Sequence, residues 1–188
     1  KDPYAIWISE IMLQQTRVDT VIPYYLRFLK RLPTVQKLAR AKIDTVLKLW
    51  EGLGYYTRAR NMHKAAKVIV VDYKGKFPQQ PEELIKIPGI GRYTAGAIAS
   101  IAFFKPAPVL DGNVIRILSR IYLIKKNSEK TAVKNELWQL AETLVCSKRP
   151  GDLNQSIMEL GARICPDSSP FCNQCPLKKT CLAKKENM

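Results

Sequence analysis

The 188-residue sequence is long enough for one large domain or two smaller ones, and its 46% hydrophobic and 25% charged content argues against a disordered chain. Thirty-one Lys and Arg against 16 Asp and Glu give a formal net charge of +15, which indicates a polyanionic partner such as nucleic acid. No apolar run is long enough to cross a bilayer and no basic amphipathic helix or secretory signal is visible, so we expect no membrane partner.

Helical periodicity runs along most of the sequence, with Pro, Gly and Asp between the periodic segments. Asp2 and Pro3 predict the start of a first helix. Residues 68–71 have the composition of a strand, but they continue the pattern of residues 58–67, so we predict a helix there. No alternating strand pattern appears, and the fold class should be all-α. Further helices are expected at about 18–31, 35–40, 45–51, 57–74, 82–87, 92–104, 112–124, 131–146 and 153–164.

One sharp break lies inside this helical pattern, at Pro88-Gly89-Ile90-Gly91. Glycine adopts a positive φ without steric cost, so the sequence predicts a tight turn between two helices, a helix–hairpin–helix. The N–H groups near Gly89, Gly91 and Arg92, at the start of the second helix, would form a cradle for a phosphate. An ordinary turn between two helices explains these residues equally well when they are considered alone.

Two polar residues are harder to interpret from position alone. Asp111 precedes Gly112 and a new helical segment, so it is expected to cap that helix, and the same position would bring a carboxylate close to a bound sugar. The two roles are compatible. His63 is the only histidine, and we expect it on a helix surface with no role as a ligand or base.

Four cysteines near the C-terminus have the spacing C-x6-C-x2-C-x5-C. Nothing indicates a secreted protein, so four thiolates in a short segment indicate a metal centre rather than disulfides. A four-cysteine zinc site commonly pairs two tight hairpins, whereas only one pair here is tight, so the spacing favours an iron–sulfur cluster over zinc. Cys146 stands apart and is expected to be a buried thiol. The predicted ligands are Cys165, Cys172, Cys175 and Cys181.

The combined motifs resemble the helix–hairpin–helix DNA glycosylases that carry a 4Fe–4S cluster, a family that includes endonuclease III. The similarity covers essentially the whole chain and is greatest to the MutY-type adenine DNA glycosylases. It implies an all-α enzyme with a six-helix barrel domain at residues 1–107, a 4Fe–4S cluster domain at residues 108–188, and a DNA cleft between them. The motifs that carry the resemblance, besides the hairpin and the cysteines, are residues 9–16, 52–61, 110–114, 154–155 and 159–162.

The resemblance assigns catalytic roles to several residues. Glu10 matches the acid that protonates adenine and helps to activate water, and its apolar neighbours would desolvate the carboxyl and raise its pKa. Asp111 matches the aspartate that stabilises the cation-like sugar. Tyr93 stands where bifunctional relatives carry a lysine, which implies a monofunctional enzyme in which the phenol hydrogen-bonds within the carboxylate site. Gln155 matches a position in the adenine pocket.

The resemblance also assigns contacts with DNA. Gln14, Gln15 and Thr16 match the segment that enters the space opposite the flipped base. Leu53 and Tyr55 match a wedge between glycines that pushes into the base stack. Phosphate contacts are expected from Arg58 and from the hairpin residues Gly89, Gly91 and Arg92.

The expected function is therefore base excision repair by a monofunctional DNA glycosylase, which removes adenine mispaired with 8-oxoguanine or guanine. We expect a monomer acting on double-stranded DNA, in the cytoplasm of a prokaryote or the nucleus of a eukaryote. Three alternatives remain: a thymine or uracil mismatch glycosylase of the same family, an endonuclease III-like glycosylase and lyase, and a non-catalytic DNA-binding module that carries the cluster. Gln14 and Gln15 argue against the first alternative, and Tyr93 argues against the second.

Three departures from the family pattern accompany this interpretation. The family's segment just upstream of Asp2, and the domain downstream of the cluster that reads oxidised guanine, have no counterpart in these 188 residues. The first residue is Lys rather than Met, so the sequence is expected to be a fragment. The loop at residues 166–171 contains no Lys or Arg, although relatives often carry basic residues there for DNA.

Overall fold

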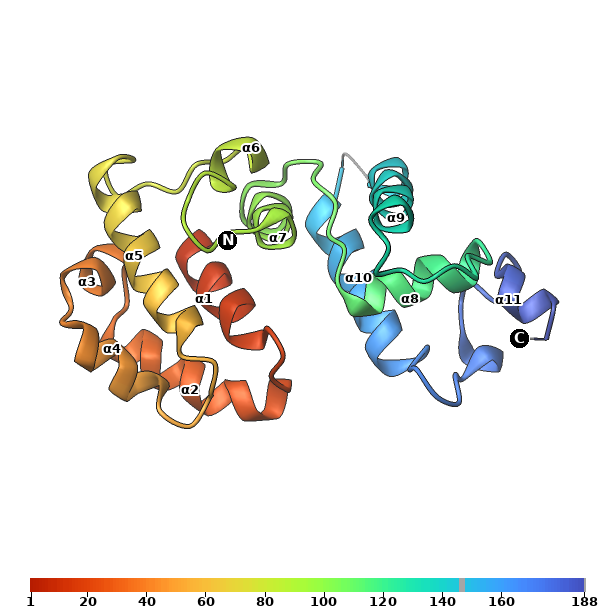
Figure 1. Cartoon of the computed structure of the whole chain (residues 1–188), viewed down its shortest axis with the longest axis horizontal. Coiled ribbons are helices and arrows are strands. Elements are labelled where there is room, and N and C mark those ends of the chain that lie inside the picture. The colour runs from red at the N-terminus through yellow and green to blue at the C-terminus, as the bar shows by residue number, and fades with distance from the viewer. Residues whose placement is uncertain (146–147, 188) are drawn as a thin grey trace. The chain divides into compact units, whose positions relative to one another are not determined.

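The computed structural model describes residues 1–145 and 148–187, and within these ranges every regular element is a helix (Figure 1). This confirms the all-α prediction. The chain divides into two compact units, Lys1–Phe103 and Phe104–Met188. None of the helices described is long and apolar enough to cross a membrane. The expectation that Cys146 is a buried thiol lies outside the described residues.

The first unit contains helices α1 to α7. Their bounds follow the predicted segments closely, and residues 68–71 continue helix α5 as expected. The differences lie at the ends, because α6 is a single turn and α5 stops three residues before the predicted end. The helices are α1 Pro3–Leu13, α2 Val18–Arg31, α3 Val35–Arg40, α4 Ile43–Trp50, α5 Thr57–Val71, α6 Pro81–Leu84 and α7 Arg92–Phe103.

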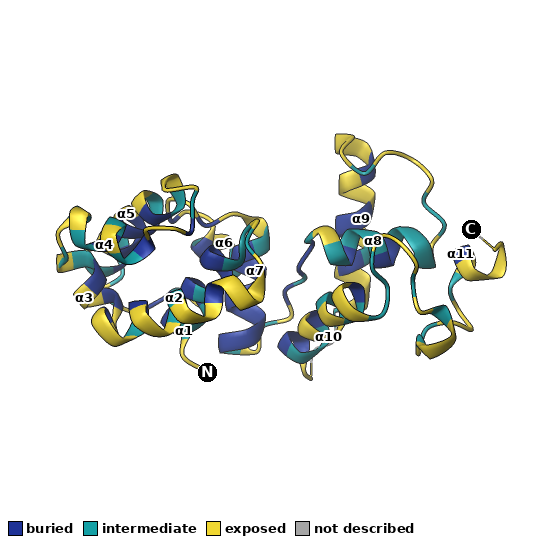
Figure 2. Ribbon diagram, turned by 90° about the horizontal axis from the view of Figure 1, so that it is seen from below, coloured by how far each residue is buried: buried dark blue, intermediate teal, exposed yellow. Residues whose placement is uncertain are grey.

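One part of the core of the first unit forms where α1 packs against α7. In α7 every residue from Thr94 to Ala102 is buried, and most are small, so the two helices approach closely. Trp7 of α1 is 1% exposed and meets the ring of Phe77 edge-on, with centroids 5.5 Å apart. Figure 2 shows the buried residues of the helices in dark blue and the exposed residues in yellow. The Asp2 side chain caps α1 by accepting a hydrogen bond from the Tyr4 N–H, as predicted.

His63 is buried, so the prediction of a surface histidine is wrong. Its side chain lies on the face of α5 that packs against α3, and its Nε2 is 3.0 Å from the carbonyl oxygen of Ala41. Burial lowers the pKa of His63, and the nearby Lys67 lowers it further. A neutral imidazole therefore joins the two helices.

The second unit contains α8 Gly112–Ile121, α9 Thr131–Leu144 and α10 Pro150–Arg163. Helix α10 begins three residues before the predicted start, with Pro150 in its first turn. Two short elements were not predicted, the 3₁₀ helix Cys172–Gln174 and α11 Leu182–Lys185.

Helix α10 contacts both α8 and the segment that precedes α8. Gly161 lies so close to α8 that an added Cβ would sit 2.7 Å from the Cβ of Asn113, and glycine therefore allows the helices to approach. The buried amide of Asn154 donates to the carbonyl oxygen of Ala107 at 2.8 Å. Residues 104–107, which the sequence analysis placed in the first domain, accordingly lie within the second unit.

Candidate active site

Glu10 is a buried carboxylate in the core of the first unit. It lies on α1 and is 8% exposed, and its neighbours Trp7 and Ile11 are also buried. Tyr93, in the first turn of α7, donates a hydrogen bond from its hydroxyl to Glu10 Oε2 at 2.7 Å. The structure thus contains the tyrosine–carboxylate hydrogen bond that the sequence analysis expected. A carboxyl placed in this way is shielded from bulk water and fixed in orientation.

The hairpin before α7 presents its glycines to solvent. Ile87 and Ile90 are buried and anchor the turn, while Gly89 and Gly91 are exposed. Gly89 has a φ of +79°, and a Cβ there would sit 2.9 Å from the Cβ of Asn61, so both conformation and space require glycine. Gly91 has a φ outside the left-handed region, so the turn needs a left-handed glycine only at Gly89. It precedes Arg92 at the N-terminus of α7, and the space beside it is open.

The segment after α1 contains the glutamines predicted to enter the duplex. Helix α1 ends at Leu13, and Gln14 follows as its C-cap. Gln15 is exposed and has a φ of +57°, which is uncommon for a residue with a side chain. Thr16 closes the turn by donating its N–H to the Leu13 carbonyl at 3.3 Å.

The loop between α4 and α5 corrects one half of the predicted wedge. Leu53 is only 6% exposed, so its side chain belongs to the core and is not available to enter DNA. Tyr55 is 63% exposed and has a φ of +49°. The backbone between Gly52 and Gly54, which both have positive φ, turns one side chain inward and presents the other to solvent.

Arg58 also requires a correction. The sequence analysis assigned it to a phosphate contact, but its guanidinium points into the protein. It donates to the backbone carbonyl groups of Ile11, Met12, Gln14, Leu53 and Gly54 and to the hydroxyl of Thr16. Burial lowers the pKa of Arg58 below its ordinary value. The side chain therefore connects two loops of the first unit.

Asp111, in the second unit, has a more polar environment than Glu10. As predicted, it caps a helix: Oδ1 accepts a hydrogen bond from the Val114 N–H at 2.8 Å. Oδ2 accepts a second hydrogen bond from the side-chain amide of Asn113 at 2.9 Å. The half-buried carboxylate is thus held in place by two donors, one on each oxygen.

A chain of hydrogen bonds continues from Asn113 to the first cysteine. Arg116 donates from Nη2 to Asn113 Oδ1 at 2.8 Å and to the Gly161 carbonyl at 2.7 Å, and from Nε to the Cys165 carbonyl at 2.8 Å. The sequence analysis missed Arg116. The available signal was its spacing of three residues from Asn113, which places both on one face of a helix.

Gln155 lies on α10 in the second unit and is exposed. Its side-chain amide donates to the Gly151 carbonyl one turn earlier, at 2.9 Å. The neighbouring Asn154 is 4% exposed and faces the core.

The four cysteines of the C-terminal segment line one cavity of about 470 Å³. Within the described ranges, no three Cys, His, Asp or Glu side chains lie close enough together to hold a single metal ion. Cysteine thiolates that share one cavity fit a metal centre, because they are the ligands that both structural zinc sites and iron–sulfur clusters use. Arg120, which the sequence analysis also missed, donates to Cys165 Sγ at 3.0 Å and to the carbonyl oxygens of Pro166 and Asp167.

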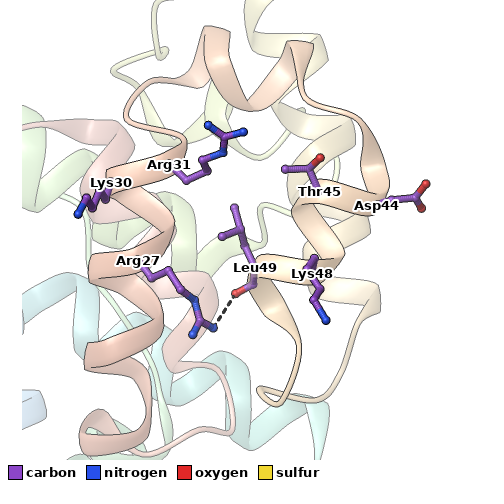
Figure 3. Close-up of a pocket in the computed structure, with 7 residues that line it drawn as sticks. All are labelled: Arg27, Lys30, Arg31, Asp44, Thr45, Lys48 and Leu49. Atoms are coloured by element: carbon purple, nitrogen blue, oxygen red, sulfur yellow. Dashed lines mark hydrogen bonds between the residues drawn. The ribbon is translucent and has the colours of Figure 1, made fainter.

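A basic hollow of about 850 Å³ lies between α2 and α4, apart from all the predicted site residues (Figure 3). Arg27 donates to the Leu49 carbonyl at 3.3 Å across it, and Lys48 pairs with Glu51 at 2.6 Å. Lys30 and Arg31 add two more cations to its lining. The hollow contains no catalytic pair, and its charge adds to the general attraction of the chain for polyanions.

Comparison with known proteins places this geometry in a family. Residues 8–143 match the model of the HhH-GPD superfamily, described as base excision DNA repair protein. The chain is 50% identical over 181 residues to the adenine DNA glycosylase of Rattus norvegicus, covering 96% of this chain and 35% of that protein. It is 48% identical over 187 residues to the adenine DNA glycosylase of Buchnera aphidicola subsp. Baizongia pistaciae, covering 100% of this chain and 53% of that protein.

A solved structure supports the same relationship. The structure of a thermostable thymine-DNA glycosylase aligns with a TM-score of 0.88 at 30% sequence identity, covering 98% of this chain and 85% of that one. The chain spans between about a third and about half of the length of the two adenine glycosylases that it matches.

Proposed function

Because the chain belongs to the HhH-GPD superfamily of base excision DNA repair proteins, we propose that it is a DNA glycosylase that removes adenine from mispairs with 8-oxoguanine or guanine. The level of identity to the adenine glycosylases, over nearly the whole chain, supports adenine as the base. The observation that carries the chemistry is the buried Glu10 carboxyl, with the Tyr93 hydroxyl 2.7 Å from its Oε2.

Glu10 acts as the general acid of the reaction. Adenine is a poor leaving group unless a ring nitrogen is protonated, and a positioned carboxyl can supply that proton as the glycosidic bond breaks. Trp7 and Ile11 exclude water from the carboxyl, and Tyr93 fixes its orientation. After the base has left, the same carboxylate accepts a proton from the attacking water, so the sugar hydroxyl is formed and Glu10 regains its proton.

Asp111 stabilises the positive charge that develops on the sugar. Its two hydrogen-bond donors, the Val114 N–H and the Asn113 amide, fix the orientation of the carboxylate. A preorganised negative charge of this kind stabilises an oxocarbenium-like transition state without having to reorganise.

Tyr93 supports hydrolysis without strand cleavage. A lysine amine at this position would attack the sugar carbon and form a Schiff base, which opens the route to strand cleavage. A phenol cannot form that adduct. The product is therefore an intact strand that carries an abasic site.

The cavity lined by the four cysteines is the proposed site of a 4Fe–4S cluster. Its ligands would be Cys165, Cys172, Cys175 and Cys181. A bound cluster would crosslink the loops between residues 165 and 181, and its potential would be set by groups such as the Arg120 guanidinium at Cys165 Sγ. The protein would bind duplex DNA as a monomer. The exposed side chains of Tyr55 and Gln15 would contact the mispair, and the N–H groups of the hairpin glycines would contact phosphates.

The test of this function is single-turnover excision on four duplexes, which contain adenine opposite 8-oxoguanine, adenine opposite guanine, thymine opposite guanine, or an oxidised pyrimidine. Each product is analysed with and without alkali. We expect adenine release from the first two duplexes and strand breaks only after alkali treatment. Release of thymine but not adenine would indicate a thymine mismatch glycosylase instead. Strand cleavage at neutral pH, together with borohydride trapping of the protein on DNA, would indicate a lyase.

Elemental analysis tests the cofactor separately. The purified brown protein should contain about four irons and four sulfides per chain, and a Cys146→Ala variant should retain them. One zinc and no iron, or loss of iron in the Cys146→Ala variant, would contradict the ligand assignment.

A further inference from the structure

The end of helix α1 is capped by a side chain from another helix. Because α1 stops at Leu13, its last carbonyl groups have no partner within the helix. Arg58, in the first turn of α5, donates from Nη1 to the Ile11 carbonyl at 2.9 Å, to the Met12 carbonyl at 3.0 Å and to the Gln14 carbonyl. A cation at this end of a helix also complements the helix dipole.

The other half of the same guanidinium holds the second loop. Nη2 of Arg58 donates to Thr16 Oγ1 at 3.2 Å, to the Leu53 carbonyl at 3.3 Å and to the Gly54 carbonyl at 3.4 Å. One planar, charged group therefore joins two loops whose residues are about 40 positions apart in the sequence.

Aromatic rings enclose the guanidinium. Its central carbon lies 5.4 Å from the ring centroid of buried Trp50 and 5.4 Å from that of Tyr55. Trp50 adds a hydrogen bond of its own, from Nε1 to the Gly54 carbonyl at 3.0 Å. A lysine would keep the charge, but it lacks the planar fork and the flat face that this arrangement uses.

The two residues that project from these loops have an unusual backbone conformation. Gln15 has a φ of +57° and Tyr55 a φ of +49°, and both are exposed. Residues with side chains keep such a conformation only where the surrounding structure enforces it. Arg58 bonds to groups of Gln14 and Thr16, on both sides of Gln15, and to Gly54, directly before Tyr55.

We propose that Arg58 is a positioning residue that locks Gln15 and Tyr55 into one preformed unit for entry into the base stack. This inference rests on the proposed function, in which both loops meet the duplex. Two separate flexible loops would each have to be ordered when DNA binds, whereas a unit that is already ordered avoids that loss of entropy. Arg58 acts through the loops, and its guanidinium donates its hydrogen bonds to carbonyl and hydroxyl groups within the protein.

Hydrogen–deuterium exchange of the DNA-free protein tests the proposal without relying on any activity. The variant is Arg58→Lys, and the matched control is Arg60→Lys, an exposed arginine on the same helix. In Arg58→Lys we expect amides of residues 14–16 and 51–56 to exchange faster together, by about tenfold, because several hydrogen bonds to a charged group are lost. Amides of α7 should keep their exchange rates, and the control should match the parent protein.

Chemical rescue and excision complete the experiment. An Arg58→Ala variant should regain slow exchange in both loops when methylguanidinium is added far below denaturing concentrations. Single-turnover excision of adenine opposite guanine should fall in Arg58→Lys and recover with methylguanidinium in Arg58→Ala.

Three results would overturn the proposal: faster exchange in only one of the two loops, an equal rise in α7, or no rescue by methylguanidinium. An absence of adenine excision in the parent protein, with the exchange results as expected, would instead reject the proposed substrate and leave the role of Arg58 intact.

Discussion

The two carboxylates assigned to the reaction occupy opposite kinds of environment. Glu10, in the first unit, is buried on α1, as are Trp7 and Ile11, and one of its oxygens accepts a hydrogen bond from the Tyr93 hydroxyl of α7. Asp111, in the second unit, is half-buried at a helix start and accepts a backbone N–H and a side-chain amide. The first carboxylate is buried and accepts a hydrogen bond from the Tyr93 hydroxyl, whereas the second lies at a half-exposed helix start and accepts from the Val114 N–H and the Asn113 amide.

The difference matches two different tasks. A general acid must keep a proton near neutral pH, and an apolar surrounding disfavours the charged form. A group that stabilises a cationic sugar acts through its negative charge, and donors that hold the carboxylate in place spare it any reorganisation during the reaction. Where two carboxylates have unlike environments, the environments indicate which is the acid and which is the electrostatic stabiliser.

The largest expected effect is the loss of the acid. Glu10→Gln keeps the shape of the side chain and should bind the mispaired duplex normally, while single-turnover excision falls by roughly 10²–10⁴-fold. The control is Glu136→Gln, an exposed glutamate of α9, which should excise at the parent rate. A Glu10→Gln rate near that of the parent would remove Glu10 from the mechanism.

The next effect concerns the charge of Asp111. Asn caps helices as well as Asp does, so Asp111→Asn should leave the unfolding free energy nearly unchanged. Excision should fall by roughly 10²–10³-fold, because a preorganised charge is lost. Urea unfolding and single-turnover kinetics measure the two quantities. A large loss of stability with little loss of rate would mean that Asp111 acts mainly as a cap.

A smaller effect is expected where α10 touches α8. In Gly161→Ala the new methyl group would lie 2.7 Å from the Cβ of Asn113 and 3.0 Å from its carbonyl oxygen, so α8 must move. We expect a loss of about 1–3 kcal/mol in unfolding free energy. Excision should slow as well, because Asn113 orients Asp111. Ser156→Ala, at an exposed position of α10, is the control and should change neither quantity. Unchanged kinetics in Gly161→Ala would separate Asn113 from catalysis.

The smallest effect should come from Tyr93→Phe, which removes the hydrogen bond to Glu10 and leaves the packing in place. A single hydrogen bond contributes about 0.5–1.5 kcal/mol, so excision should fall by no more than about tenfold. The matched comparison is Asn113→Ala, which removes the donor to Asp111 together with the acceptor of Arg116 and should cost more. The reverse order, from the same single-turnover assay, would show that Glu10 depends on its hydrogen bond from Tyr93 more than Asp111 depends on its hydrogen bond from Asn113.

The sequence was sufficient to predict the elements that depend on local pattern. Apolar residues at helical spacing located most of the helices, and Asp2 and Asp111 were correctly predicted as caps. Helices α6 and α11 have four residues each, too few for a periodic signal to define their ends.

The side chains that were misinterpreted depend on contacts between distant segments. Leu53 and Tyr55 are both hydrophobic residues in one glycine-containing loop, and only the folded backbone decides which is buried. Arg58 is paired with groups 42 to 47 residues earlier in the chain, and a basic residue beside such a loop is equally consistent with phosphate binding. His63 is neutral and packed against α3, a role that leaves no local pattern in the sequence.

If Glu10 supplies a proton and Asp111 supplies charge, excision should depend on the leaving group in a different way when each carboxylate is lost. Single-turnover rates of the parent protein, Glu10→Gln and Asp111→Asn are compared on duplexes with adenine and with a purine analogue that departs readily without protonation. We predict that the defect of Glu10→Gln shrinks strongly on the analogue, because the acid is no longer needed, while the defect of Asp111→Asn stays the same. Equal shrinkage in both variants, or a Glu10→Gln defect that persists on the analogue, would contradict the division of roles.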